Sequence, residues 1–166
     1  MAKTKKLAFM AVLTAIALTI FMIENQIPAP VPIPGVKLGL ANIITLTAMY
    51  ILGRREAGAV LLMRVVMGAV FAGAPSTLIY SAAGGLCAYL VMCLCIGLFK
   101  ESQMWIISVL SAIAHNAGQL AACALIVKTP GILVYAPILA VSAVITGLFT
   151  GFAAMYLVRA VKKMRL

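Results

Sequence analysis

SQMWIISVLSAIAHNAGQLAACALIV, the stretch from Ser102 to Val127, contains 26 residues and no charged side chain. As a helix it would rise about 39 Å, which exceeds the ~30 Å hydrocarbon core of a bilayer. Three polar residues, His115, Asn116 and Gln119, lie at its centre. Because unpaired polar groups are costly at mid-membrane, these side chains either bond neighbouring helices together or contact a ligand.

The composition of the whole chain is that of an integral membrane protein. Of its 166 residues, 65% are hydrophobic and 10% are charged, whereas soluble domains average about 25% charged residues. The formal net charge of +10 would suggest nucleic-acid binding in a soluble chain. Here the basic residues flank apolar segments, so we expect no nucleic-acid partner. The length suits one domain over residues 1–166.

Breaks in the apolar pattern divide the chain into six expected transmembrane helices. Residues 57–99 are uncharged apart from Arg64 and too long for one crossing, so we place a turn at Gly73–Thr77. Charged residues, glycines and prolines mark the other helix ends. The expected helices lie at about residues 7–23, 38–52, 57–72, 78–99, 104–127 and 137–158.

Positive charge is concentrated on one side of this arrangement. Ten Lys and Arg residues fall at the two termini and in the turns after the second and fourth helices. Lys37 and Lys128 fall on the opposite side. The positive-inside rule then places both termini in the cytoplasm. The expected fold is therefore an all-α bundle of six transmembrane helices with both termini cytoplasmic.

Polar residues also occur in the second and third expected helices. Asn42 and Thr45 suit either interhelical packing or a place in a binding site with the central cluster. Arg64 lies about two turns into the third helix, and we expect no acid at its depth. Its guanidinium group either snorkels to the headgroups, caps carbonyl groups or binds an acid on a partner subunit.

Small residues form one side of the first helix. Ala8, Ala11 and Ala15 recur at helical spacing, which permits the close approach of another helix. The chain has no G-x-x-x-x-G-K-[ST] motif and so cannot hydrolyse ATP in the Walker manner. A partner docked on this alanine face would have to supply the energy for any active transport.

The segment after the first helix is polar and rich in proline. Glu24, Asn25 and Gln26 precede alternating prolines at positions 28, 30, 32 and 34, which favour an extended backbone. This segment is either a gate over the outer mouth of a pocket or a solvated loop.

Several residue types needed for catalysis are missing. The chain contains three Glu and no Asp, whereas magnesium–diphosphate chemistry needs clustered carboxylates. A single His without acidic neighbours is a poor metal site and a poor catalytic base. We therefore expect no catalytic residues, no bound metal, no cofactor and no enzymatic activity.

The segments KLGLANIITL (Lys37–Leu46) and AHNAGQL (Ala114–Leu120) resemble motifs of the Gx transporter family, also called heptaprenyl diphosphate synthase component I. The resemblance covers nearly the whole chain, including Arg64 and the Gly84–Gly85 pair. That family is grouped with the substrate-binding S-components of energy-coupling factor (ECF) transporters, which are six-helix proteins of bacterial cytoplasmic membranes.

The resemblance implies a function and a set of partners. It implies an S-component-like subunit that binds a small, vitamin-type molecule from outside and docks, through Ala11 and Ala15, on a T-subunit driven by two ATPases. The proline segment would close the pocket, whose expected ligand contacts are His115, Asn116, Gln119, Asn42 and Thr45. Relatives near flavin-linked electron-transfer genes also point to redox proteins as partners.

Two other functions stay open at this stage. One is an accessory membrane component of polyprenyl diphosphate synthesis, as the family's second name implies. The other is a structural membrane subunit of a redox complex. A co-purifying small ligand would favour the binding subunit, whereas a requirement in prenyl transfer would favour the synthase component.

Overall fold

The computed structural model of this chain describes residues 3–27, 37–73 and 75–164, and these contain helices and no β-strand. Six α-helices and two short 3-10 helices follow one another along the chain. They are α1 (Lys3–Glu24), α2 (Asn42–Ile51), α3 (Arg54–Ala72), α4 (Pro75–Cys95), η1 (Glu101–Gln103), α5 (Met104–Val127), η2 (Pro130–Tyr135) and α6 (Ala136–Lys163). The number and order of the α-helices match the expectation from sequence.

Four of the helical segments are long and apolar enough to cross a membrane, which agrees with a membrane protein. They comprise α1, α4, α5 with η1, and α6 with η2. The helix α3 has 19 residues but carries Arg54, Arg55 and Glu56 at its start and Arg64 near its middle. The helix α2 has 10 residues and rises about 15 Å, half of a bilayer core. Six complete crossings therefore stay a prediction.

The start of α2 differs from the expectation. The sequence predicted a helix from Leu38, but α2 begins at Asn42 because Gly39 interrupts the helical backbone with a φ of +78°. Glycine adopts this left-handed conformation without steric cost. Hydrogen bonds from the backbone N–H of Asn42 to the carbonyl of Gly39 and from Ile43 to Leu40 form a turn instead. The second membrane segment thus consists of a turn followed by a half-length helix.

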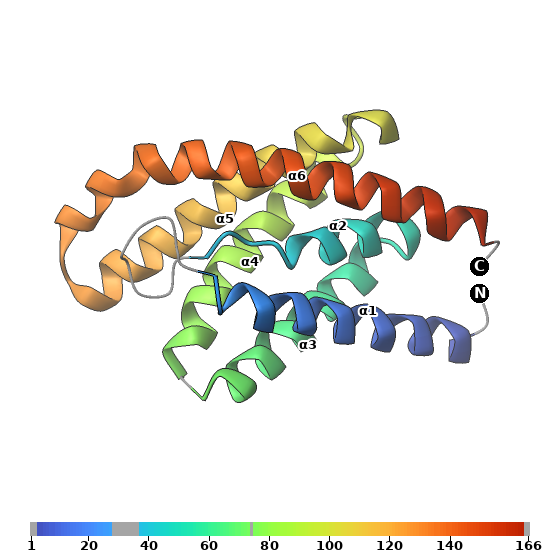
Figure 1. Cartoon of the computed structure of the whole chain (residues 1–166), viewed down its shortest axis with the longest axis horizontal. Coiled ribbons are helices and arrows are strands. Elements are labelled where there is room, and N and C mark those ends of the chain that lie inside the picture. Colours follow the sequence, from blue (N-terminus) through green and yellow to red (C-terminus); the bar gives the residue numbers. More distant parts are fainter. Residues whose placement is uncertain (1–2, 28–36, 74, 165–166) are drawn as a thin grey trace.

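The helices pack into a single bundle whose two termini lie at the same end (Figure 1). The most extensive contacts join α5 to α6 and α4 to α5, while α3 packs against both α1 and α4. The short α2 contacts α1, α3 and α6. At the α5–α6 contact, Gly147 and Gly151 lie so close to the backbone of α5 that a Cβ atom at either position would come within 2.6 Å of a Cα atom. This spacing of small residues brings two membrane helices together.

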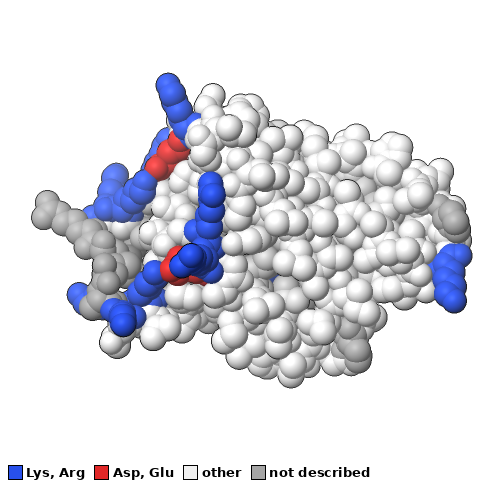
Figure 2. Space-filling view, turned by 180° about the vertical axis from the view of Figure 1, so that it is seen from behind, with Lys and Arg blue, Asp and Glu red and all other residues white. Residues whose placement is uncertain are grey.

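Charged residues gather at the ends of the bundle. Figure 2 shows Lys and Arg side chains crowded at the end that carries the termini, a single small basic patch at the opposite end, and a wide uncharged surface between them on this face. Ion pairs at the basic end join Lys6 to Glu56 and Lys162 to Glu101. This distribution suits a protein that crosses an apolar layer with its basic end in the cytoplasm.

The predicted topology can be tested by cysteine labelling. The four native cysteines are free and can be replaced to give a cysteine-free background. A single cysteine at Lys128 should then react with an impermeant maleimide added to intact cells, while cysteines at Arg55 and Lys100 should react only after lysis. All three native side chains are exposed. Labelling of the Arg55 position in intact cells would contradict the topology.

Candidate functional site

A small polar chamber lies inside the bundle where α1, α3, α4 and α5 meet the turn before α2. It has a volume of about 10 Å³, roughly the space that one water molecule needs. Its lining combines one aromatic ring, two cations, one carboxylate and four further residues: Phe21, Glu24, Lys37, Gly39, Arg64, Ser81, His115 and Gln119.

Apolar packing on both sides fixes the place of the chamber along α5. Met104 and Ile107 belong to the larger hydrophobic cluster of the bundle. Leu120 and Cys123 belong to a second cluster. His115, which is 2% exposed, and Gln119, which is 1% exposed, come between these two pairs in the sequence of the helix. The chamber is therefore a polar layer between two apolar ones.

Two side chains hold the turn before α2 against the chamber. Gln119 accepts a hydrogen bond from the backbone N–H of Lys37 through its side-chain oxygen, at 3.0 Å. The carboxylate of Glu24 accepts one from the backbone N–H of Gly39. Glu24 is only 4% exposed, so it lies inside the bundle and not in a solvated loop.

Arg64 is buried in the chamber and does not snorkel to the headgroups. Its side chain is 3% exposed, and its Nη1 atom donates to the Ser81 hydroxyl at 3.1 Å. Its Nε and Nη2 atoms are buried and have no hydrogen-bond partner among the described residues. The expectation that no acid lies at the depth of Arg64 was wrong, because Glu24 lines the same chamber.

Lys37 brings a second cation to the chamber. Its ammonium nitrogen lies 3.9 Å from the centroid of the Phe21 ring, a cation–π contact. Burial lowers the pKa of Lys37; Glu24 opposes this effect and Arg64 adds to it, so that the pKa falls from 10.5 to about 8. The ammonium group is therefore still charged at neutral pH but close to losing its proton.

The His115 ring lies between two glycines. A Cβ atom on Gly39, or one on Gly84 of α4, would approach the imidazole to 2.9 Å, and one on Gly84 would approach Gln119 to 2.7 Å. Both ring nitrogens are buried without a hydrogen-bond partner in the described part of the chain. The two glycines thus leave room for the imidazole in the chamber wall.

The other residues of the predicted binding set lie elsewhere. Asn116 does not line the chamber, because its amide nitrogen donates to the Leu139 carbonyl of α6 at 3.0 Å. Asn42 is buried beside Gly39, and its side-chain oxygen has no hydrogen-bond partner among the residues that the structure describes. Thr45 is buried but is not part of the lining. Asn116 therefore bonds helices together, which was one of its two interpretations.

The structure describes only part of the predicted gate. Glu24 belongs to the chamber, whereas Asn25 and Gln26 are exposed. The proline segment proposed to close the pocket, residues 28–36, lies outside the described residues. The predicted docking residues Ala8, Ala11 and Ala15 are all exposed on α1.

Sequence reasoning missed four lining residues: Phe21, Lys37, Gly39 and Ser81. For Arg64 the sequence left three interpretations: snorkelling, capping of carbonyl groups, and binding of an acid on a partner subunit. The sequence position of Arg64 could have indicated that its side chain is buried. Arg64 comes ten residues after Arg54, about 15 Å along α3, and from that depth its side chain reaches the headgroups with difficulty. No group of three or more His, Cys, Asp or Glu side chains suited to a metal ion occurs among the residues searched.

A helical membrane protein with a charged chamber inside its bundle is the class that these features define. The chain belongs to the heptaprenyl diphosphate synthase component I family, whose family model matches residues 13–157. No curated protein and no solved structure matches the chain.

Replacing Gly84 tests the close packing around His115 and Gln119. Gly84→Ala should lower the melting temperature of the purified protein by several degrees, because overpacking costs about 1–3 kcal/mol. Gly85→Ala is the matched control, since its methyl group would meet the flexible end of the Leu61 side chain at 3.0 Å. Equal melting temperatures for the two variants would contradict this packing.

The pH dependence of stability tests the burial of Lys37. Between pH 8 and 10.5 the unfolded chain keeps a proton that the folded chain has released, so the contribution of Lys37 to stability rises with pH. Lys37→Met should therefore melt at a higher temperature than the unmodified protein at pH 7, and this difference should shrink towards pH 10. Lys128→Met, at an exposed site, should show no such trend. A constant difference for Lys37→Met would refute the lowered pKa.

Proposed function

We propose that this chain is the substrate-binding membrane subunit of an ATP-driven importer for a small, vitamin-type molecule. The observation that carries this proposal is the buried chamber, in which charged and polar groups converge without fully satisfying one another. Buried polar groups usually find partners, and exceptions call for an explanation such as an unseen ligand. Arg64, His115 and Gln119 would contact the substrate, together with Asn42 at the edge of the chamber.

The position of the chamber supports capture from outside the cell. The C-terminal end of α1 lies away from the end of the bundle that carries the termini (Figure 1). With the termini in the cytoplasm of a bacterial plasma membrane, as proposed here, this end of α1 faces outward. Glu24 and Gln119 hold the described segment Lys37–Gly39 at the chamber. The closed chamber has room for about one water molecule, so a solute would enter it from the outer side only when the segment Lys37–Gly39 moves away.

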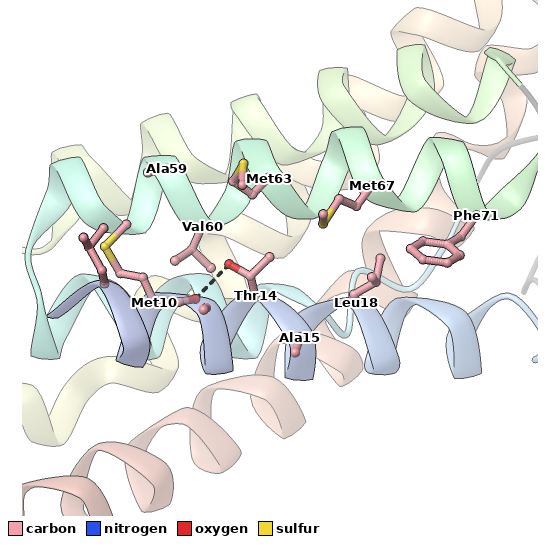
Figure 3. Close-up of a pocket in the computed structure, with 11 residues that line it drawn as sticks. Met10, Thr14, Ala15, Leu18, Ala59, Val60, Met63, Met67 and Phe71 are labelled. Atoms are coloured by element: carbon pink, nitrogen blue, oxygen red, sulfur yellow. Dashed lines mark hydrogen bonds between the residues drawn. The ribbon is translucent and has the colours of Figure 1, made fainter. Parts of the chain in front are cut away.

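A partner would have to provide the energy, because the sequence has no Walker motif. The helices α1 and α3 form a groove of about 540 Å³ that is open to the surroundings (Figure 3). Its lining is almost entirely apolar and includes Ala11, Ala15 and Ala59 beside Met63 and Met67. We propose that a transmembrane helix of a T-subunit-like partner occupies this groove, because small residues permit close helix contact. Ala8 is exposed nearby but does not line the groove.

A second candidate function is supported by the family's name. An accessory membrane component of heptaprenyl diphosphate synthesis would assemble with a catalytic subunit, and membership of that family favours such a partnership. The residues offer no catalytic site of their own for this chemistry, since the sequence contains no Asp. We therefore propose that the chain binds rather than catalyses in either case.

Native mass spectrometry of the gently solubilised complex tests the first function against the second. The importer proposal predicts a bound small molecule and ATPase subunits in the complex. The synthase proposal predicts a prenyltransferase partner and loss of prenyl transfer in membranes that lack this chain. A complex with neither a ligand nor ATPases, combined with loss of prenyl transfer, would replace the first function by the second.

Bulky residues in the groove test the docking proposal. The double variant Ala11→Leu/Ala15→Leu should recover at least tenfold less partner protein when the tagged chain is purified from its own membranes, because the leucines fill the contact surface. Ala160→Leu, at an exposed position of α6, is the matched control. Both variants should elute as monodisperse proteins when purified alone. Normal partner recovery with the double variant would show that α1 does not dock.

A further inference from the structure

The geometry points to a carboxylate group on the substrate, bound by the Nε–Nη2 edge of Arg64. This inference rests on the proposed binding function and names the chemistry of the ligand. It depends on three features of the described residues: an unused hydrogen-bonding edge, an unbalanced charge, and the start of a half-length helix.

The unused edge belongs to the Arg64 guanidinium. Ser81 occupies Nη1, and the buried Nε and Nη2 atoms have no partner in the part of the chain that the structure describes. Nε–H and one N–H of the adjacent amino group point in parallel from one edge of a guanidinium plane. Such a pair matches the two oxygens of a carboxylate in a bidentate arrangement. A carboxylate would therefore supply the hydrogen-bond acceptors that Nε and Nη2 of Arg64 lack.

Glu24 does not fill this role in the described structure. Its carboxylate accepts the backbone N–H of Gly39. The ion pairs found among the described residues join Lys6 to Glu56 and Lys162 to Glu101, and neither involves Arg64. Glu24 therefore lowers the positive potential of the chamber without occupying the bidentate edge.

The formal charges of the lining favour one negative charge on the ligand. Arg64 and Lys37 contribute two positive charges and Glu24 one negative charge, so the chamber has an excess of one positive charge. A carboxylate would cancel this excess at low dielectric, where unbalanced charge is most costly. A phosphate monoester, with a charge of about −1.5 to −2 at pH 7, would overcompensate it.

The start of α2 adds to the same potential. This helix begins at Asn42, directly after the turn that contains Gly39, and Gly39 lies against His115 in the chamber wall. The first N–H groups of α2, on Asn42, Ile43 and Ile44, donate to carbonyl groups of the preceding turn, so the contribution of this helix start to anion binding is its dipole. Interrupted membrane helices whose half-helix starts face a binding site recognise anionic substrate groups in this way. The helix start and the guanidinium edge thus favour the same kind of group.

Acetate and acetamide are suitable probes, because they have the same shape and differ in charge. The purified full-length protein should show a saturable rise in melting temperature with acetate, at constant ionic strength with chloride as the balancing anion. Half-saturation with acetamide should need at least a tenfold higher concentration, and inorganic phosphate should be weaker than acetate. Equal responses to acetate and acetamide, no response to acetate, or a stronger response to phosphate would overturn the carboxylate assignment.

Variants of Arg64 test the edge itself. Arg64→Lys keeps the positive charge but loses the pair of parallel N–H donors, and Arg64→Gln loses both the charge and the pair. The acetate affinity should therefore fall at least tenfold in each variant. Arg159→Gln, on the exposed side of α6, is the control and should respond like the unmodified protein. Unchanged acetate affinity in a folded Arg64→Lys variant would overturn the inference. If both Arg64 variants fail to fold, the comparison of acetate with acetamide still decides.

Mass spectrometry of the small molecules extracted from the native complex separates this inference from the proposed function. A bound compound with a carboxylate supports both. A bound compound without one overturns the carboxylate assignment and leaves the binding function standing. No bound compound, together with no response to acetate, overturns both.

Discussion

An arginine buried deep within an apolar bundle is the constraint on which the arrangement of the chamber depends. A guanidinium group cannot lose its charge and is costly to bury without partners. Arg64 nevertheless lies inside the bundle, where α4 provides Ser81 and α1 provides Glu24 and the Phe21 ring. These segments are far apart in sequence. The charge of Arg64 therefore gives several helices a common point around which to pack.

The neighbouring polar residues divide into two groups with different roles. Asn116 bonds to the Leu139 carbonyl, and Ser108 bonds to Thr150 at 2.7 Å, so both join α5 to α6. His115 and Gln119 occupy the side of α5 that faces the chamber. One helix thus combines a packing face with a face that presents polar groups to an internal space. A side chain that is polar and buried is therefore not sufficient evidence of a binding site.

Helix number and most helix positions could be predicted, because long apolar runs and their breaks follow directly from the solvent properties of a bilayer. The unpredicted parts depend on tertiary contacts. The start of α2 shifted to Asn42 because Gly39 adopts a backbone conformation that an apolar pattern does not encode. His115 and Gln119 could be selected by their depth. The proximity of Glu24 to Arg64 could not be predicted. It depends on the axial position of α1 relative to α3, which hydropathy does not determine.

The turn before α2 has a kinetic consequence. Only two side-chain acceptors, on Glu24 and Gln119, tie the backbone of Lys37 and Gly39 to the chamber among the described residues. Breaking two such bonds costs about 2–4 kcal/mol. That free energy corresponds to an open population of about 0.1–3%, within the usual range for minor protein states. We therefore expect transient opening of this turn, and not diffusion of the solute to the protein, to limit how fast the chamber exchanges its contents.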